Sequence, residues 1–471
     1  MVAKKDLCVL VLAGGKGTRM KSDLPKPLHK VSGNAMLCHI LNTAQRLTPS
    51  KIGVLTGHQA QLVKETVQKN LKNWGINTPV DFILQKQLTG SGTAAKDSMP
   101  FMKKYEHALI LAGDAPLIKA DTLKKLIQTH NKAKAACTVF TVDIDNPKGY
   151  GRIVKDSKNN FIKIVEESEA AGTPRAAIKE VNSGMYIFDT KALAAMLPLL
   201  RPQGPKKEYY LTDVLALLKQ KGHKVEVFKA ADCSEAMGIN SKKQLAEAEQ
   251  LMQQKINDML MESGITLINP ALTYIGAGVK IGADSVIYPN TFISGKTMIG
   301  AGCIIGPGCW IEDSIIAENV RLKSGCYLTG ATIGPNCTAG PYAHLRPGAV
   351  LKENAKVGNF VEIKKSVIGK NSKVPHLTYI GDTDMGANVN IGAGTITCNY
   401  DGVNKYKTMI GEGVFVGSNT NFVAPVAVGK NSRIGAGSTI TQDIPAGMLS
   451  IARARQVNLK TKSKVKKDKK K

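Results

Sequence analysis

Glycines and basic residues near the amino terminus have the types and spacing of a phosphate-binding loop. Gly14, Gly15 and Gly17 follow an apolar run, and Arg19 and Lys26 come shortly after them. Glycines let a backbone approach phosphates closely, and the two cations would neutralise phosphate charge. The loop matches neither the dinucleotide-binding pattern, whose last glycine is missing, nor the P-loop, whose Lys-Ser/Thr pair is missing. A plain glycine turn after a strand is the alternative.

A second group of chemically capable residues lies within positions 343–381. Arg346 and Lys364 have the charge to hold a phosphate, Arg as a fork and Lys as a point charge. His376 belongs to the residue type that titrates near neutrality and therefore suits proton transfer. For each of the three, an ordinary solvated surface position is the alternative. Their meaning depends on the elements that carry them.

The first 230 residues alternate short apolar runs with amphipathic stretches. Residues 7–12 and 108–111 read as buried strands, and residues 121–132 have the periodicity of a helix. This alternation predicts an α/β fold with a mostly parallel, Rossmann-like sheet covered by helices on both faces. Ligands of such sheets bind beyond the carboxyl ends of the strands. The loops after Leu12 and Leu111 are therefore the predicted places for chemistry.

Beyond Gly264, aliphatic residues recur at every sixth position. Three such runs begin at Ile275, Ile333 and Ile410, and many of their members precede glycine. This spacing is the hexapeptide signature of a left-handed parallel β-helix, in which each hexapeptide forms one face of a triangular coil and points its aliphatic side chain inward. A solenoid can be purely structural, so the repeat by itself does not establish a function.

The two halves are joined by a predicted helix. Ser241 can cap it, its apolar positions step by three and four residues, and Gly264 stops it. We therefore predict four parts: a first domain over residues 1–240, a linker helix over 241–263, a β-helix over 264–459 and a basic, disordered tail over 460–471.

Composition narrows the classes of protein and partner. No stretch approaches the ~20 apolar residues of a membrane span, and nine cysteines without metal-like pairs indicate reduced thiols in the cytoplasm. The net charge of +27, to which the lysine tail contributes, calls for anionic partners. Because aromatic residues are only 5% and no nucleic-acid-binding motif appears, phosphorylated small molecules explain the charge at least as well as nucleic acid. We expect neither a membrane nor a nucleic-acid partner.

Several strings of residues resemble a known family. Residues 12–20 and 24–28 are similar to the signature of sugar-1-phosphate nucleotidyltransferases, and 111–117, 149–153 and 209–213 continue the resemblance. Together with the hexapeptide half, the chain resembles the bifunctional family that combines N-acetylglucosamine-1-phosphate uridylyltransferase with glucosamine-1-phosphate acetyltransferase. The resemblance covers nearly all of the chain except the tail. It implies acetylation of glucosamine 1-phosphate by acetyl-CoA, followed by uridylyl transfer from UTP with release of pyrophosphate.

The resemblance also implies the residues of a uridylyl-transfer site. UTP and the product would contact Leu12, Ala13, Gly14, Gly15, Lys26, Gln85, Gly90, Ser91, Ala112, Gly113, Asp114 and Asn240, and N-acetylglucosamine would contact Gly151, Glu166 and Asn182. Arg19 and Lys26 would be catalytic, and Asp114 and Asn240 would bind Mg²⁺. One carboxylate and one amide suit this ion, because they leave coordination positions for phosphate oxygens and water.

Three points stay open for this site. By its residue type, Asp114 could instead belong to a turn before Pro116. Asn240 could instead cap the linker helix. The chain also departs from the family pattern at Ser168 and Glu169, where the family has Lys-Asp, which concerns the loop beside Glu166.

For the β-helix, the resemblance implies an acetyl-transfer site. His376 would be the base that removes the ammonium proton of the amino sugar. The sugar phosphate would be bound by Arg346, Lys364, Tyr379 and Asn390, and acetyl-CoA by Ala393, Asn399, Tyr400, Ser418, Ala436 and Arg453. The family forms trimers, so we expect a homotrimer with sites between subunits. The rival interpretations are a nucleotidyltransferase whose β-helix only regulates it, an inactive sugar-nucleotide sensor, and a basic RNA-binding scaffold.

Overall fold

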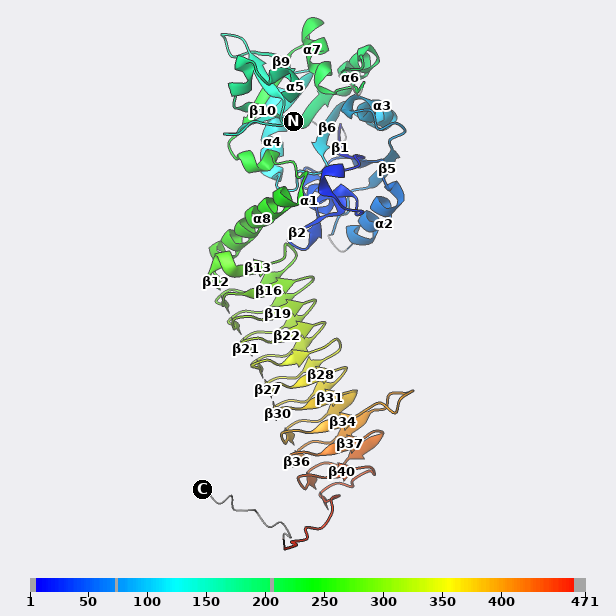
Figure 1. Ribbon diagram of the computed structural model, residues 1–471, viewed down its shortest axis with the longest axis vertical. Helices are drawn as coiled ribbons and strands as arrows, with labels where there is room; N and C mark the ends of the chain where they lie inside the picture. The colour runs from blue at the N-terminus through cyan, green and yellow to red at the C-terminus, as the bar shows by residue number, and fades with distance from the viewer. Residues whose placement is uncertain (1–5, 73–74, 204–206, 461–471) are drawn as a thin grey trace, which may run out of the picture. The chain divides into compact units, whose positions relative to one another are not determined.

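The computed structural model of the 471-residue chain describes residues 6–72, 75–203 and 207–460 (Figure 1). The chain divides into two compact units, Met1–Lys255 and Ile256–Lys471, and the division falls within the long helix α8 (Lys242–Glu262). Of the predicted basic tail, residues 461–471 lie outside the described residues. No helix in the described ranges is long and apolar enough to cross a membrane.

The first unit is built on a nine-stranded sheet. Its strands are β1 (Leu7–Ala13), β4 (Lys51–Thr56), β5 (Val80–Leu84), β6 (His107–Ala112), β7 (Cys137–Asp143), β8 (Arg152–Lys155), β9 (Phe161–Val165), β10 (Glu180–Asp189) and β11 (Val225–Ala230). They lie in the order β11-β7-β10-β6-β1-β4-β5, and β8 pairs with β10 and β9. β10 is antiparallel to β6 and β7, whereas β1, β4, β5 and β6 are mutually parallel. A two-stranded hairpin, β2 (Lys30–Val31) and β3 (Asn34–Ala35), lies apart from this sheet.

Helices cover both faces of this sheet, as the alternating pattern predicted. They are α1 (Met36–Gln45), α2 (Ala60–Leu71), α3 (Ser91–Met102), α4 (Ala120–Ala133), α5 (Glu167–Ala170), α6 (Thr190–Met196) and α7 (Thr212–Gln220), with short 3-10 turns η1 (Thr18–Met20), η2 (Lys26–Leu28), η3 (Pro174–Ala177), η4 (Leu197–Leu199) and η5 (Cys233–Ala236). Residues of α1, α2 and α4 share one buried cluster with Val9 and Val11, while residues of α3, α6 and α7 share another with Cys8 and Leu10. Side chains of one strand alternate between faces, so β1 is buried on both sides.

The second unit is a left-handed parallel β-helix made of three parallel sheets. The first sheet contains β12 (Thr266–Leu267), β15 (Val286–Ile287), β18 (Ile304–Ile305), β21 (Arg321–Leu322), β24 (Thr338–Ala339), β27 (Lys356–Asn359), β30 (Lys373–His376), β33 (Asn390–Ile391), β36 (Phe415–Val416), β39 (Arg433–Ile434) and β41 (Leu449–Ser450). The second contains β13 (Thr273–Ile275), β16 (Thr291–Ser294), β19 (Trp310–Glu312), β22 (Tyr327–Thr329), β25 (His344–Leu345), β28 (Glu362–Lys364), β31 (Tyr379–Gly381), β34 (Ile396–Cys398), β37 (Asn421–Val423) and β40 (Thr439–Ile440). The third contains β14 (Lys280–Ile281), β17 (Met298–Ile299), β20 (Ile315–Ile316), β23 (Thr332–Ile333), β26 (Val350–Leu351), β29 (Val367–Ile368), β32 (Thr383–Met385), β35 (Thr408–Ile410) and β38 (Val426–Val428).

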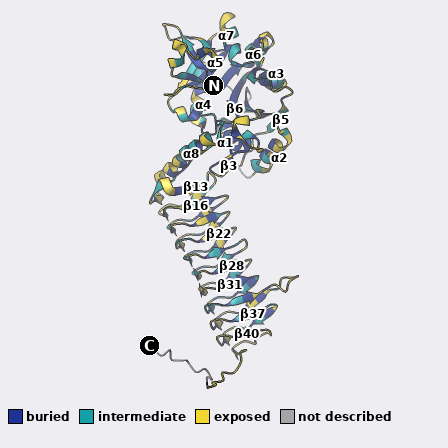
Figure 2. Ribbon diagram, in the orientation of Figure 1, coloured by how far each residue is buried: buried dark blue, intermediate teal, exposed yellow. Residues whose placement is uncertain are grey.

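The aliphatic residues at six-residue spacing fill the interior of the coils, as predicted. All members of the runs that begin at Ile333 and Ile410 are buried, and Figure 2 shows this buried interior along the β-helix. In the first run, Ile281 is only partly buried. It lies in β14, the first strand of the third sheet, so no preceding coil covers it.

Candidate active sites

The predicted phosphate loop and Asp114 lie side by side at the carboxyl edge of the sheet. β1 and β6 pair in parallel with Leu12 opposite Ala112, so the loops that follow them leave the same edge. The Gly113 amide donates a hydrogen bond to the Leu12 carbonyl at 2.9 Å. A Cβ atom on Gly113 would lie 2.5 Å from that oxygen, which explains why glycine is needed there. The sequence prediction for this edge is therefore matched by the geometry.

Lys26 lies between the two residues predicted to hold a cation. Its ammonium contacts the Asp114 carboxylate and donates to Asn240 Oδ1 at 2.6 Å. Arg19 donates to the same amide oxygen at 2.9 Å. The Lys26 side chain is 14% exposed and that of Asp114 26% exposed, so these charges interact in a partly dehydrated setting. An acidic and an amide oxygen thus converge on one cationic group, which is the donor set a hard divalent cation prefers.

Asp114 does lie in a turn, directly after β6, but its carboxylate contacts Lys26 from there, and neither Asp114 nor Asn240 caps a helix through its side chain. The helix that follows Asp114, α4, begins only at Ala120, so Asp114 caps no helix. The amino terminus of α8 is capped by Ser241, whose Oγ accepts the Gln244 amide at 3.2 Å. The Asn240 side-chain oxygen is instead directed to Arg19 and Lys26.

Three of the predicted UTP contacts, Gln85, Gly90 and Ser91, flank the glycine loop. Gln85 lies against Gly14, where a Cβ atom would come within 2.5 Å of its Oε1. Its amide group donates to the Gln87 carbonyl at 3.0 Å. Gly90 adopts φ +109 and sits beneath the Tyr209 backbone, and Ser91 Oγ accepts the Leu211 amide at 2.9 Å. Segments far apart in the sequence are thereby joined around the loop.

The three residues predicted to contact the sugar also come together. The Asn182 amide donates to the Gly151 carbonyl at 2.8 Å. A Cβ atom on Gly151 would lie 3.5 Å from Glu166 Oε2. Burial raises the pKa of Glu166 above its usual value, and the hydrogen bond that Thr212 donates to the carboxylate only partly offsets this rise. The side chains of Ser168 and Glu169, where the family pattern is broken, are exposed on α5.

Asp213 is a further acidic residue of this region that sequence reasoning did not assign. Burial, and then the nearby charges of Glu166 and Glu169, raise the pKa of Asp213 to about 6. Between pH ~4 and 6 the folded chain therefore binds a proton that the unfolded chain does not bind. By linkage, this group contributes stability at low pH that is lost as pH rises through about 6.

Asp213→Asn is accordingly expected to raise the melting temperature of the first domain at pH 7, because no charge then needs to be buried. At pH 4 the same substitution is expected to change it little. Each kcal/mol gained would appear as roughly 2–4 °C in a domain of this size. Asp121→Asn is the control, since Asp121 is an exposed partner of Lys124 and its pKa is lowered, not raised. Calorimetry at the two pH values measures the effect, and an equal shift at both would contradict it.

In the β-helix, His376 lies at the corner between the first and second sheets. It ends β30 and is exposed, and its Nδ1 lies 2.7 Å from Asn359 Oδ1. Backbone hydrogen bonds link the following coils at this corner, from Gly394 to His376, Asn419 to Ala393 and Gly437 to Ser418, at 3.4, 2.8 and 2.8 Å. The column ends where Arg453 Nη1 donates to the Ala436 carbonyl at 2.6 Å. The structure therefore places four predicted acetyl-CoA residues in line with His376.

Two of the predicted phosphate ligands, Arg346 and Lys364, lie at the other edge of the second sheet. Arg346 Nη1 donates to Glu362 Oε1 at 2.8 Å, which holds the guanidinium in place. Lys364 follows Glu362 along β28. Contact with Lys405 lowers the pKa of Lys364, with a smaller effect from Arg346. Three cations thus crowd one place, which favours an anionic ligand.

Lys405 was missed from the sequence, and the reason is structural. It lies in an excursion from the coil, where Tyr400 and Lys405 pair in antiparallel fashion. Its ammonium is 6.0 Å from the centre of the Tyr400 ring. Hexapeptide spacing is interrupted here, so no periodic argument could relate Lys405 to Lys364. Only the fold brings these two lysines together.

The remaining predicted residues are divided between two places. Asn399 is buried and donates to Asp382 Oδ2 at 2.5 Å, so it shares the corner of Lys364, whose carbonyl accepts the Asp382 amide at 3.1 Å. Tyr400 is exposed beside it. Tyr379 lies opposite Glu362 in the second sheet, and Asn390 lies opposite Lys373 in the first. Within one chain, Asn399 and Tyr400 are thus at a different corner from the other acetyl-CoA residues.

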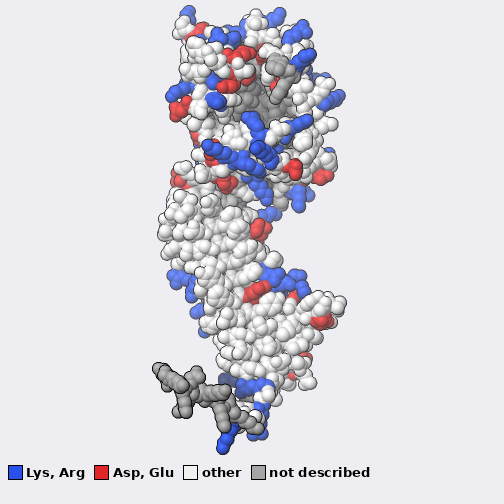
Figure 3. Space-filling model, viewed as in Figure 1, with Lys and Arg blue, Asp and Glu red and all other residues white. Residues whose placement is uncertain are grey.

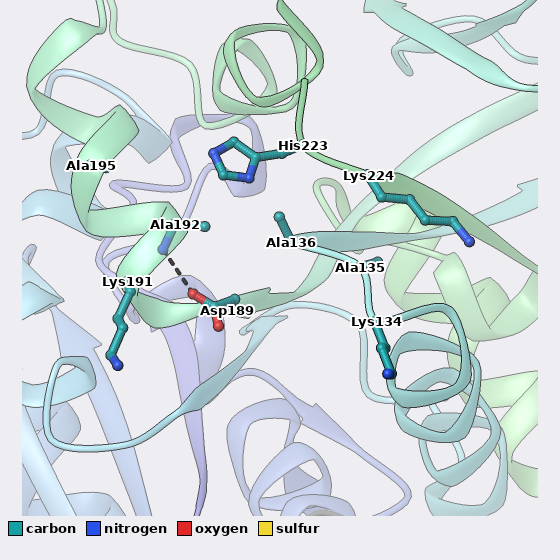
Figure 4. Close-up of a pocket in the computed structure, with 9 residues that line it drawn as sticks. All are labelled: Lys134, Ala135, Ala136, Asp189, Lys191, Ala192, Ala195, His223 and Lys224. Atoms are coloured by element: carbon teal, nitrogen blue, oxygen red, sulfur yellow. Dashed lines mark hydrogen bonds between the residues drawn. The ribbon is translucent and has the colours of Figure 1, made fainter. Parts of the chain in front are cut away.

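A cavity of about 460 Å³ lies away from all of these residues (Figure 4). Ala136 and Lys224 line it and precede β7 and β11, so it opens at the amino edge of those strands, opposite the edge that carries Asp114. Three lysines also line it, but Figure 4 shows their side chains pointing away from one another. In Figure 3, by contrast, Lys and Arg side chains gather on the viewed face of the first unit.

Each family that matches this chain falls within one of the two compact units. Residues 8–233 match the family described as nucleotidyl transferase, residues 270–361 match the GMPPB C-terminal domain, and residues 407–442 match six repeats of the bacterial transferase hexapeptide. The chain is 46% identical to the bifunctional protein GlmU of Carboxydothermus hydrogenoformans, over 95% of this chain and 98% of that protein. It is 47% identical to the bifunctional protein GlmU of Heliobacterium modesticaldum, over 95% of each. The chain belongs to the GlmU family.

Membership in the GlmU family makes this chain a bifunctional transferase of UDP-N-acetylglucosamine synthesis, with uridylyltransferase and acetyltransferase activities. The nucleotidyltransferase half of a GlmU protein requires a divalent metal ion. The predicted family, fold class and pair of activities are therefore confirmed. The match to the GMPPB C-terminal domain ends at residue 361, before His376.

Proposed function

We propose that the two activities of this GlmU protein use two separate sites and proceed in order. Acetyl transfer to the amine of glucosamine 1-phosphate takes place beside His376, and uridylyl transfer to the acetylated product takes place beside Asp114. The observation that carries the first-domain site is the convergence of Asp114 and Asn240 oxygens on the Lys26 ammonium. The column from His376 to Arg453 supports the second site.

For uridylyl transfer, we propose Asp114 and Asn240 as the protein ligands of Mg²⁺. Bound there, this ion would neutralise charge that develops on the phosphates of UTP. Among the described residues, no three His, Cys, Asp or Glu side chains are grouped to hold a metal, so the other ligands would be phosphate oxygens and water. Removal of divalent ions by a chelator should stop pyrophosphate release, and Mg²⁺ should restore it.

The first-domain residues then act by positioning and charge. The sugar phosphate oxygen attacks the α-phosphorus of UTP, and pyrophosphate leaves toward Arg19 and Lys26, which stabilise its negative charge. Gly14, Gly15 and Gly113 let the backbone approach the nucleotide, with Leu12, Ala13, Gln85, Gly90, Ser91 and Ala112 around it. Gly151, Glu166 and Asn182 orient the N-acetylglucosamine group.

For acetyl transfer, we propose His376 as the general base. It takes a proton from the ammonium of glucosamine 1-phosphate, and the free amine attacks the thioester carbonyl of acetyl-CoA. The C–S bond then breaks and the nitrogen loses its second proton, so that one of the two protons ends on the CoA thiolate and the other goes to solvent. Arg346, Lys364 and Lys405 bind the sugar phosphate, with Tyr379 and Asn390 near the sugar. Ala393, Asn399, Tyr400, Ser418, Ala436 and Arg453 bind acetyl-CoA.

We further propose a homotrimer in which the acetyl-transfer sites lie between subunits. The His376 corner and the Lys364 corner are on opposite edges of the second sheet. A strand of this sheet, such as β31, is three residues long here, so the two corners are separated by roughly 10 Å. A partner's corner could complete each half-site. A column of aromatic rings on the second sheet also offers apolar surface to a partner; Tyr274, Trp310 and Tyr327 are exposed, and Phe292 between them is half-buried. Sedimentation equilibrium of the full chain tests the trimer.

We also propose a cytoplasmic location, which the free cysteines fit.

The role of Lys405 gives a test of the phosphate site. Lys405→Ala is expected to raise the KM for glucosamine 1-phosphate about 5- to 10-fold with little change in kcat, because a ground-state charge contact is lost. Lys407→Ala is the matched control, since Lys407 instead pairs with Asp384 at 2.8 Å on the coil surface. Steady-state assays of CoA release measure both. Equal KM values for the two variants would remove Lys405 from the site.

A further inference from the structure

The imidazole of His376 has a fixed partner on the preceding coil. Asn359 ends β27 and His376 ends β30, and the two residues lie opposite each other in the parallel pairing of these strands. Asn359 Oδ1 and His376 Nδ1 are 2.7 Å apart, the distance of a good hydrogen bond. The interaction joins residues that are 17 positions apart, one coil of the β-helix.

The backbone holds both side chains at this corner. The Leu377 amide donates to the Asn359 carbonyl at 3.0 Å, so the two coils are tied directly beside the side-chain contact. Phe360 and Leu377, which follow the two residues, adopt left-handed φ values of +54 and +47. Bulky residues rarely adopt this conformation, which Asn occupies at many other corners of this β-helix. Such backbone outliers persist where the surroundings over-determine them, and they gather at functional sites.

The chemistry of the amide decides the tautomer of the imidazole. A carboxamide oxygen only accepts hydrogen bonds, so the proton of the neutral ring must be on Nδ1. Nε2 then carries the lone pair, and it is the nitrogen left free to take a proton. After proton transfer, the imidazolium keeps its Nδ1–H bond to Asn359. The contact therefore suits both states of a general base.

We propose that Asn359 is the positioning residue that holds His376 in the tautomer able to act as a base at Nε2. The inference rests on the proposed role of His376 and adds the partner that orients it. Asn359 touches no substrate in this account and acts only through the imidazole. Apart from the pair itself, the charged side chains on strands β27 and β30 are Lys356 and Lys373, which lie at the opposite ends of those strands.

Two substitutions of Asn359 in the full-length chain separate orientation from simple packing. Asn359→Leu keeps a similar size but removes the acceptor, and we expect kcat for acetyl transfer to fall about 10- to 100-fold. Both KM values and the uridylyltransferase rate should change less than about 2-fold, since no substrate contact is lost. Asn359→Asp keeps the acceptor and adds a charge that favours the imidazolium. It should retain far more activity than Asn359→Leu, with the acidic limb of its pH–rate profile moved to higher pH.

The tautomer can be measured directly by ¹⁵N NMR of the full-length chain with ¹⁵N-labelled histidine rings. The signal that disappears in His376→Ala identifies the residue, and we expect it to show hydrogen on Nδ1 at alkaline pH. In Asn359→Leu it should move toward the other tautomer. Hydrogen on Nε2 in the unsubstituted chain, or full kcat in Asn359→Leu, would overturn the role of Asn359. Retained acetyl transfer in His376→Ala would overturn the base assignment itself, so the two failures are distinguishable.

Discussion

Asp114→Asn is expected to lower the rate of pyrophosphate release about 10²- to 10³-fold or more and to leave acetyl transfer unchanged. Of the two proposed protein ligands of Mg²⁺, only Asp114 is charged, and a neutral amide in its place would hold the ion weakly. Loss of a single preorganised electrostatic group in an active site has effects of this size. The measurement is coupled detection of pyrophosphate with UTP and N-acetylglucosamine 1-phosphate.

A matched substitution shows whether the loss is specific to the site. Asp121→Asn removes an exposed carboxylate of the same domain, whose partner is Lys124 on the surface of α4. We expect this variant to keep nearly full activity in both assays, because exposed ion pairs contribute little. If Asp114→Asn and Asp121→Asn released pyrophosphate at similar rates, the metal role of Asp114 would be wrong.

His376→Ala is expected to have the opposite pattern, with acetyl transfer about 10²- to 10⁴-fold slower and pyrophosphate release retained. The amino group of the substrate is protonated at neutral pH, and without the proposed base its proton would have to pass to solvent. The exposed position of the residue predicts little effect on the melting of the β-helix. Thiol release from acetyl-CoA measures the activity.

The internal control for this variant is the uridylyltransferase assay on the same preparation. A correctly folded His376→Ala chain that loses both activities would contradict two separate sites. Retained acetyl transfer would move the base to another residue.

The sequence predicted the fold well because its two repeating patterns have simple physical causes. Inward aliphatics at every sixth position are required to fill a triangular coil, and residues such as Leu345 and Phe422 are indeed buried. A strand buried on both faces requires a continuous apolar run, as in β1. The loops that carry Gly14 and Asp114 were predictable because parallel strands of such a sheet present their carboxyl ends together.

The residues that the sequence did not reveal depend on contacts between distant positions. Asn359 is related to His376 only by the coil length, and Lys405 meets Lys364 through an excursion that interrupts the repeat. Glu362 appears in the sequence as one more surface carboxylate, yet it holds Arg346. Periodicity reports which side chains point inward, and it carries no information on which outward side chains meet across coils.

One measurement on the unsubstituted full-length chain tests the ordered two-site account most directly. Pyrophosphate release from UTP and Mg²⁺ is followed with either glucosamine 1-phosphate or its N-acetylated form, each with and without acetyl-CoA. We predict release from the acetylated sugar in both cases, and release from glucosamine 1-phosphate only when acetyl-CoA is present, with free thiol appearing first. Equally fast release from glucosamine 1-phosphate without acetyl-CoA, or no thiol release at all, would contradict the account.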